Sequence, residues 1–178
     1  MYKTGHQGLA MILYSPVGLA LLLFGLGVHA IAGFFTVIFL STLPDIDMKL
    51  PIKHRGPTHT VWFAIGVGIV IGIIFAAAAQ GYYINADSIG ETVQTGEDIF
   101  ILGTGLFGLF IGFYGIVAHI LGDVITPMGV RPFAPVKKKR YRYVLTKAAS
   151  DTGNYLLWVF GICAILLCLY LGIRYTPV

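Results

Sequence analysis

Five apolar runs constrain the fold of this 178-residue chain more than any other feature, and they cover residues 4–23, 28–42, 57–80, 99–125 and 152–175. About 20 apolar residues cross the hydrocarbon core of a bilayer as a helix. Inside that core every backbone polar group must be satisfied, which a helix does within its own segment. We therefore predict an all-α, polytopic transmembrane bundle of about five helices, forming one membrane-embedded domain over residues 1–178.

The composition supports this prediction, because 57% of the residues are apolar, only 11% are charged, and the mean hydropathy is +0.82. Pro16 removes a backbone donor and predicts a kink or a break in the first helix. If that run is re-entrant, the bundle has four spans. Pro44 predicts that the second helix ends there and that residues 43–47 form a loop. We expect Cys163 and Cys168 to be packing residues.

The basic residues are distributed very unevenly. Eleven of the twelve lie on segments that the successive crossings place on one side: Lys3, Lys49, Lys53, Arg55, Arg131, Lys137, Lys138, Lys139, Arg140, Arg142 and Lys147. The positive-inside rule predicts that this side is cytoplasmic, with an acidic loop at 87–98 facing outward. The cluster at 137–140 is either a topology determinant or a contact for anionic lipid headgroups. No phosphate-binding GxxxxGK[ST] loop or basic–aromatic surface is present, so we expect no nucleic-acid partner.

Histidine and aspartate residues gather at the same ends of the apolar runs. Burying such groups unpaired in a membrane is costly, and a divalent cation offsets that cost. The candidate metal ligands at this side are His6, Asp45, Asp47, His54, His59, His119 and Asp123. Seven N and O ligands exceed one tetrahedral zinc and predict two or more ions that share a bridging water. His29 falls near the opposite face, where we expect an interfacial or packing residue.

Two of these groups have spacings that suit a metal site. His119 and Asp123 stand four residues apart, which places them on one helix face; the alternative is a His–Asp hydrogen bond that stabilises the helix end. Asp45 and Asp47 alternate along a loop, so that both can face the mouth of the bundle. Close carboxylates repel each other unless a cation lies near them. A solvated loop with a helix-capping Asp is the alternative there.

The densest motif is HRGPTH at 54–59. It places two imidazoles five residues apart, with Gly to bend the backbone and Pro to begin a helix, so we expect His59 in that helix's first turn. Neutral histidine is the commonest metal ligand, and the guanidinium of Arg55 suits a phosphate or carboxylate oxygen of a substrate. A purely structural role for the motif is the alternative. His6 taken alone predicts only a surface histidine.

The strings LPDID (43–47), HRGPTH (54–59) and HILGDVITPMG (119–129) resemble, in order and spacing, those of the YdjM-like membrane-bound metal-dependent hydrolases. That family is distantly similar to zinc-dependent phospholipases C and single-strand-specific zinc nucleases, whose sites hold up to three zinc ions. The likeness covers residues 4–135. It implies the same seven metal ligands: His6, Asp45, Asp47, His54, His59, His119 and Asp123. Family members often carry a Glu at the start of the last helix, where Asp151 and Asn154 are the candidates to replace it.

Together these observations predict a membrane-embedded hydrolase with two or three divalent ions, zinc first among them, and a lipid phosphoester as its substrate. Asp47 or Asp123 takes or orients the proton of the attacking water, and Arg55 stabilises the developing charge. The predicted location is the inner cell membrane, with the site facing the cytoplasm. One rival is a divalent-cation transporter or sensor without hydrolytic activity. Another is a structural or partner-binding membrane protein that keeps a metal only for folding.

Overall fold

The structure is a computed structural model that describes residues 1–52, 54–88 and 96–176, and their regular structure is helical. The α-helices are α1 (Lys3–Leu23), α2 (Gly27–Leu40), α3 (Val61–Ser88), α4 (Glu97–Val124) and α5 (Asp151–Tyr175), and the 3₁₀ helices are η1 (Leu43–Lys49) and η2 (Pro57–His59). Five segments are long and apolar enough to cross a membrane, and the second of them continues from α2 through η1. The predicted all-α bundle with five spans is therefore confirmed.

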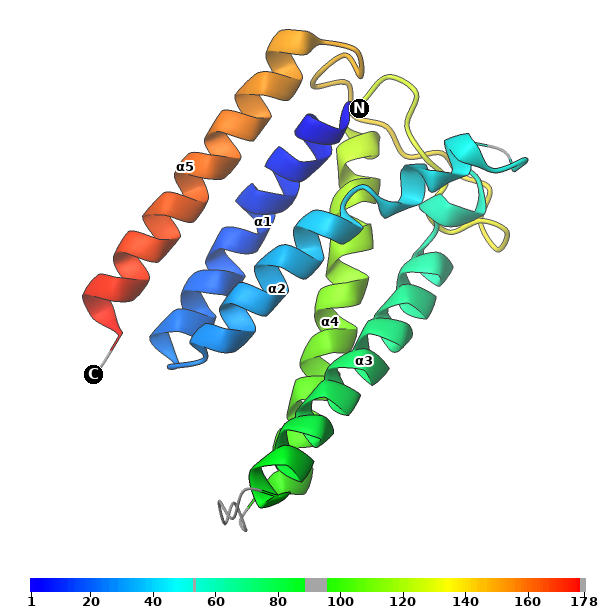
Figure 1. Cartoon of the computed structure of the whole chain (residues 1–178). Helices are drawn as coiled ribbons and strands as arrows, with labels where there is room; N and C mark the ends of the chain where they lie inside the picture. Colours follow the sequence, from blue (N-terminus) through cyan, green and yellow to red (C-terminus); the bar gives the residue numbers. More distant parts are fainter. Residues whose placement is uncertain (53, 89–95, 177–178) are drawn as a thin grey trace.

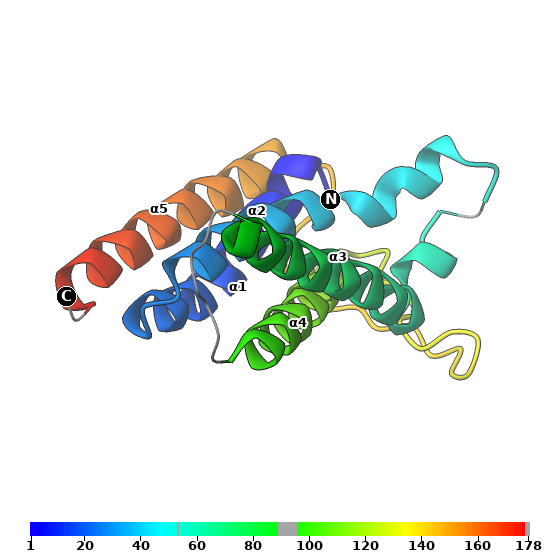
Figure 2. The same cartoon turned by 60° about the horizontal axis from the view of Figure 1, so that its bottom comes forward.

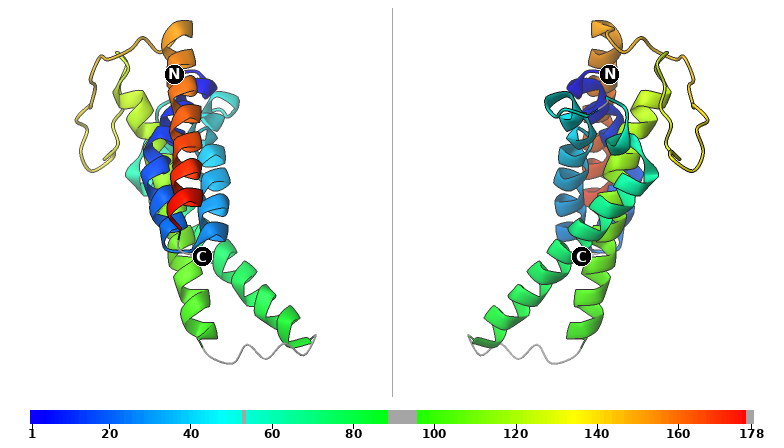
Figure 3. Two further views of the ribbon diagram at one scale, coloured as in Figure 1. Left: turned by 90° about the vertical axis from the view of Figure 1, so that its left-hand side faces the viewer. Right: turned by 90° about the vertical axis from the view of Figure 1, so that its right-hand side faces the viewer.

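The helices form a bundle in which α1 packs along α5 and α3 packs along α4 (Figure 1). Helix α2 lies against both α1 and α4 and so joins the two pairs. Figure 3 shows that α3 and α4 reach beyond the far ends of the other helices. The two termini lie at opposite ends of the bundle, as an odd number of crossings requires.

Glycines allow the paired helices to approach each other closely. A Cβ added at Gly8 of α1 would lie 2.4 Å from the carbonyl oxygen of Leu157 in α5, and one at Gly161 would lie 2.6 Å from the carbonyl oxygen of Gly8. In the other pair, a Cβ at Gly112 would lie 2.9 Å from the Cα of Gly68. Small residues at such contacts are how membrane helices gain packing energy without a hydrophobic driving force.

Helix α1 is continuous through Pro16, so a break at this position, and with it the four-span alternative, is wrong. Proline removes the N–H that would bond to the carbonyl four residues earlier, that of Ile12. The hydroxyl of Ser15 donates to this carbonyl instead, at 2.8 Å. A side chain thus satisfies the freed backbone acceptor, which is the usual way in which membrane helices tolerate proline.

Three local predictions need correction. Residues 43–47 are not a loop but part of η1, because Pro44 suits the first turn of a helix. His59 belongs to η2 and precedes α3, whose start is set by Thr60: its hydroxyl accepts the backbone N–H of Phe63 at 3.2 Å. Cys168 is buried, as expected of a packing residue, whereas Cys163 is exposed at the protein surface.

The predicted acidic loop at 87–98 is shorter than expected. Asp87 lies within the last turn of α3, and Glu97 and Asp98 form the first turn of α4. Two acidic residues at a helix amino terminus interact favourably with its dipole, which explains why α4 begins earlier than its apolar run. Glu91 lies outside the described residues.

The segment between α4 and α5 lies at the end of the bundle that carries η1 and η2 and extends to one side of it (Figure 2). Val130 and Tyr141 form an antiparallel bridge with N–O distances of 3.1 and 2.8 Å, which folds residues 130–141 into a hairpin. The backbone N–H of Val61 donates to the carbonyl of Pro132 at 2.8 Å. This bond ties the hairpin to the first residue of α3.

Candidate metal centre

All seven candidate ligands come together at the end of the bundle that carries η1, η2 and the amino terminus. His6 is supplied by α1, the two aspartates of LPDID by η1, and the two histidines of HRGPTH by η2 and the turn before it. The last two, His119 and Asp123, lie in the final turns of α4 and are buried. The tertiary structure thus joins residues from four separate parts of the sequence.

Six of these residues fall into two clusters that could hold a metal ion. The first consists of His6, His119 and Asp123, all of them buried, and the second of Asp45, His54 and His59; within each cluster the candidate ligand atoms lie within 4.8 Å of one another. The clusters adjoin, since Nε2 of His59 lies 3.0 Å from Nε2 of His119. They therefore form one continuous centre.

Three atoms in this centre, Oδ1 of Asp45 and the Nε2 atoms of His59 and His119, are spaced as the ligands of one ion are. Oδ1 of Asp45 lies 3.6 Å from Nε2 of both His59 and His119. Oδ2 of Asp123 lies 3.4 Å from Nε2 of His59 and 4.0 Å from that of His119. Tetrahedral N and O ligands bound at 2.0–2.1 Å are about 3.4 Å apart. The spacing of Asp45, His59 and His119 fits a divalent ion with two imidazole ligands and one carboxylate ligand, and Oδ2 of Asp123 lies near the same two imidazoles.

The protonation of the two imidazoles follows from their neighbours. Nδ1 of His119 lies 2.7 Å from the carbonyl oxygen of Ser41, which can only accept, so Nδ1 carries the proton of the neutral ring. Thr58 Oγ1 donates to Asp47 at 3.0 Å and therefore accepts from Nδ1 of His59, also at 3.0 Å. Both Nε2 atoms consequently present lone pairs to each other. Such an arrangement of two neutral rings is repulsive unless a proton or a metal ion lies between them.

His6 adds a further group without a partner. Its ring stacks on that of His119, with a centroid separation of 3.8 Å and an angle of 10° between the planes. Neither ring nitrogen has a hydrogen-bond partner among the described residues, and the same is true of Oδ2 of Asp123. Buried polar atoms left unsatisfied are costly. A coordinated ion removes this cost, so the residues present fit the metal that the sequence predicts.

Asp47 is the one candidate ligand outside both clusters. Its Oδ1 lies 2.8 Å from Nδ1 of His54, and its Oδ2 accepts the backbone N–H of Arg55 and the hydroxyl of Thr58, each at 3.0 Å. Oδ2 also lies 3.3 Å from Nδ1 of His59. A carboxylate behind a histidine fixes its tautomer and orientation toward a metal. This geometry suits an orienting role, and a ligand role for Asp47 stays a prediction.

Arg55 connects the centre to the surface. Its backbone has φ +57°, a left-handed conformation that is unusual for a residue other than glycine. One guanidinium nitrogen donates to Oδ1 of Asp123 at 2.5 Å, and the other to Thr126 Oγ1 and the Gly129 carbonyl, each at 3.3 Å. The side chain is only 9% exposed, yet its Nε has no partner in the described part of the chain.

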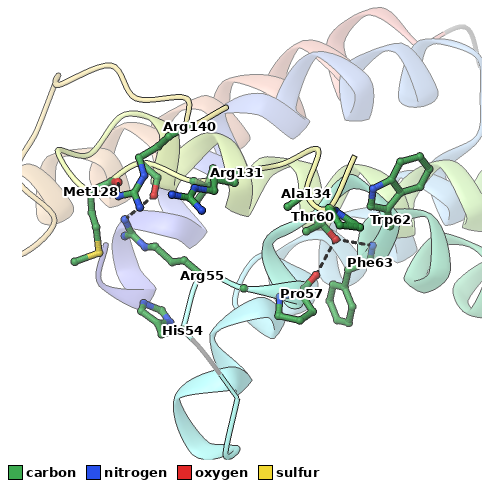
Figure 4. A pocket seen from close by; sticks show the side chains of 14 residues that line it. His54, Arg55, Pro57, Thr60, Trp62, Phe63, Met128, Arg131, Ala134 and Arg140 are labelled. Atoms are coloured by element: carbon green, nitrogen blue, oxygen red, sulfur yellow. Dashed lines mark hydrogen bonds between the residues drawn. The ribbon is translucent and has the colours of Figure 1, made fainter. Parts of the chain in front are cut away.

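A cavity of about 810 Å³ opens beside the centre, with His54 and Arg55 in its wall (Figure 4). A molecule in this cavity therefore lies against His54, a member of the second cluster, and against the side chain of Arg55.

The sequence did not reveal the structural roles of Gly122 and Asn154, which hold the centre together. A Cβ at Gly122 would lie 2.7 Å from Nδ1 of His6, so only glycine leaves room for that ring. Asn154 accepts the N–H of Tyr2 at 3.0 Å and donates to two backbone carbonyls, which occupies its amide. Asn154 therefore fixes the amino-terminal segment to the start of α5. Asp151, the other candidate to replace the family's Glu, is exposed and belongs to neither cluster. In the sequence, these two roles were indicated only by a small residue, Gly122, and a polar residue, Asn154, within apolar runs.

The fold and this centre define the class: a polytopic membrane protein whose helices bring together His/Asp clusters that could hold metal ions. The model of the YdjM inner membrane protein family matches residues 1–176, so the chain belongs to that family. The family is described as one of membrane-bound metal-dependent hydrolases, and its name places the protein in the inner membrane. Comparisons with curated proteins and with solved structures found no match.

Proposed function

We propose that this protein is a zinc-dependent phosphoesterase that hydrolyses a phosphoester bond of a membrane lipid at the cytoplasmic face. The observation that carries the proposal is the pair of facing Nε2 lone pairs of His59 and His119, next to the unpartnered Oδ2 of Asp123. A divalent cation stabilises this arrangement. The hydrolytic chemistry of the family supports a catalytic rather than a purely structural use of the ion.

A first ion would be held by Asp45, His59 and His119, and His6 and His54 would extend the ligand set toward a second ion. Imidazole and carboxylate ligands suit zinc. A bound divalent cation supplies a Lewis acid that activates water and polarises a phosphoryl oxygen.

The chain's own groups account for the remaining steps of the hydrolysis. Water attacks phosphorus and the bond from phosphorus to the leaving oxygen breaks. Asp123 takes the proton of the attacking water, because its Oδ2 is buried and accepts no hydrogen bond from the described residues. Asp47 fixes the orientation of the imidazoles of His54 and His59, because its oxygens lie next to the Nδ1 atoms of these two rings. Both oxygens are therefore already occupied. Arg55 lines the cavity, and its positive charge stabilises the negative charge that develops on a phosphoryl oxygen.

The position of the centre suits a lipid substrate. It lies at the ends of the spanning helices, where a headgroup meets water while its acyl chains stay in the hydrocarbon. The same end carries the hairpin with its basic residues, for which the positive-inside rule favours the cytoplasm.

The test is hydrolysis by purified protein in lipid nanodiscs. Phospholipids and a generic phosphodiester are supplied before and after a chelator, and then again after zinc is restored. We expect turnover to disappear with the chelator and to return with zinc. Turnover that is unchanged by the chelator contradicts the proposal. Metal flux into liposomes without hydrolysis also contradicts it and identifies a transporter.

A further inference from the structure

The cavity beside the metal centre has one strongly basic end. Arg55, Arg131 and Arg140 line this end, and His54 also lies in the wall of the cavity (Figure 4). No carboxylate belongs to the lining among the described residues. Arg55 is paired with Asp123, whereas the described part of the chain offers no ion pair to Arg131 or Arg140. Two cations therefore remain without a counter-charge at this end.

The hairpin holds these two arginines close together. Arg131 and Arg140 directly follow and precede the bridged pair Val130 and Tyr141, so they flank the bridge on the same side. Like charges that face each other across a strand pair are destabilising. Arg140 is further fixed by a 2.9 Å hydrogen bond to the carbonyl of Met128. This costly arrangement is explained if an anion occupies the space between the two guanidinium groups.

The other end of the cavity is apolar. Trp62 and Phe63, in the first turn of α3, form its wall together with Pro135 of the hairpin. Trp62 is 52% exposed on a helix that spans the membrane. The cavity therefore runs from a cationic end at the metal centre toward the lipid-facing surface of α3, which matches the division of a lipid into an anionic head and an apolar chain.

We infer that this cavity binds a lipid whose headgroup carries two phosphate groups. One phosphate lies at Arg55, beside the metal centre, the second lies between Arg131 and Arg140, and an acyl chain follows Trp62. The inference names the substrate class and rests on the proposed function only in that the first phosphate is the one hydrolysed. Arg131 and Arg140 are then specificity-determining residues.

The test is binding, followed by the fluorescence of Trp62. The chain has two tryptophans, so the substitution Trp158→Phe leaves Trp62 as the sole emitter. The protein is placed in phosphatidylcholine nanodiscs that contain either cardiolipin, which carries two phosphates, or phosphatidylglycerol, which carries one, at equal phosphate content and with brominated chains as quenchers. We expect half-maximal quenching at an about tenfold lower concentration of cardiolipin, because charge-assisted hydrogen bonds to the second phosphate are added.

The double variant Arg131→Gln/Arg140→Gln should abolish this preference. The matched control is Lys137→Gln/Lys138→Gln, which removes the same charge from the same hairpin at positions outside the cavity lining. Equal losses in both variants would show general attraction to an anionic membrane and overturn the inference. Equal quenching by the two lipids, or inorganic diphosphate that binds as tightly as cardiolipin, overturns it as well.

Quenching needs no turnover, so it is measured with and without the chelator. A protein that prefers cardiolipin but hydrolyses nothing disproves the proposed function and leaves this binding site in place. A protein that hydrolyses single-phosphate lipids and shows no preference for cardiolipin supports the proposed function and disproves the two-phosphate binding site. The midpoint of thermal unfolding checks that both double variants are folded.

Discussion

The two ends of the bundle each contain a histidine and a cavity, yet among the described residues only one end carries a candidate metal centre. The cavities are similar in size, about 810 Å³ at the metal end and about 780 Å³ at the other. At the far end, Nε2 of His29 lies 3.2 Å from the hydroxyl of Thr104, and the ring packs edge-on against Phe107. These contacts agree with the prediction that His29 is an interfacial or packing residue.

The comparison shows that neighbours, rather than the histidine or the cavity, define a site. A hydroxyl can donate or accept, so Thr104 satisfies His29 whichever tautomer the ring adopts. At the metal end, the partners of His59 and His119 already occupy the Nδ1 atoms, and the Nε2 atoms have only each other and carboxylates nearby. The described lining of the far cavity contains no charged residue. Only the metal end needs a cation.

The sharpest contrast between the two ends is expected from replacing one histidine at each. His59→Ala should lower the amount of bound zinc and reduce turnover by more than about 100-fold. Loss of an orienting partner already lowers metal affinity by about 10- to 100-fold, and loss of a direct ligand lowers it further. His29→Ala is the matched control and should leave metal content and turnover unchanged. Elemental analysis and hydrolysis rates of the purified proteins measure both. A His59→Ala protein with full metal content would remove the distinction between the ends.

Arg55→Lys separates charge from geometry at the metal end. Lysine keeps the positive charge but lacks the fork that contacts Asp123, Thr126 and Gly129. We expect turnover to fall by about 100-fold, as for the loss of one donor to a developing charge, with metal content retained. If turnover is unaffected, Arg55 serves only as a link between the η1–η2 segment and α4.

Asp47→Asn and Asp45→Asn test which aspartate is a ligand. Loss of an orienting carboxylate lowers metal affinity by about 10- to 100-fold, so Asp47→Asn should weaken zinc binding but leave the number of bound ions unchanged. Asp45→Asn should reduce that number, because Asp45 belongs to a ligand cluster. Titration with a competing chelator gives both quantities. The reverse ranking would restore the ligand role that the sequence predicts for Asp47.

The smallest expected effect comes from two glycines of α4. Gly122→Ala places a methyl group 2.7 Å from Nδ1 of His6 and should displace that ring, lowering zinc affinity a few-fold. A Cβ at Gly103, near the other end of the same helix, meets no atom within 4 Å. Gly103→Ala should therefore leave zinc binding alone and change stability by about 1 kcal/mol or less. Equal effects of both substitutions on zinc binding would mean that His6 is not a ligand.

The helices were predictable because their signal is local. Apolar runs specify spanning helices wherever they occur, and His119 with Asp123 share a face through spacing alone. The errors also have local causes that apolar periodicity does not record. The hydroxyl of Ser15 satisfies the carbonyl that Pro16 leaves free, so the helix continues. Pro44 begins a helix where it was expected to prevent one, and two acidic residues extend the start of α4 beyond its apolar run.

The chain's order of apolar and polar segments was enough to establish a five-span membrane bundle with the seven candidate ligands at one end, because hydrocarbon imposes those constraints on any sequence. The role of each polar residue depended on three-dimensional contacts. Asp47 contacts the imidazoles of His54 and His59, and the ring of His6 fits only because residue 122 is glycine. Arg131 and Arg140 both line the cavity because they flank the bridge between Val130 and Tyr141. These contacts join residues far apart in the chain, and their energies depend on distances and directions that no local pattern contains.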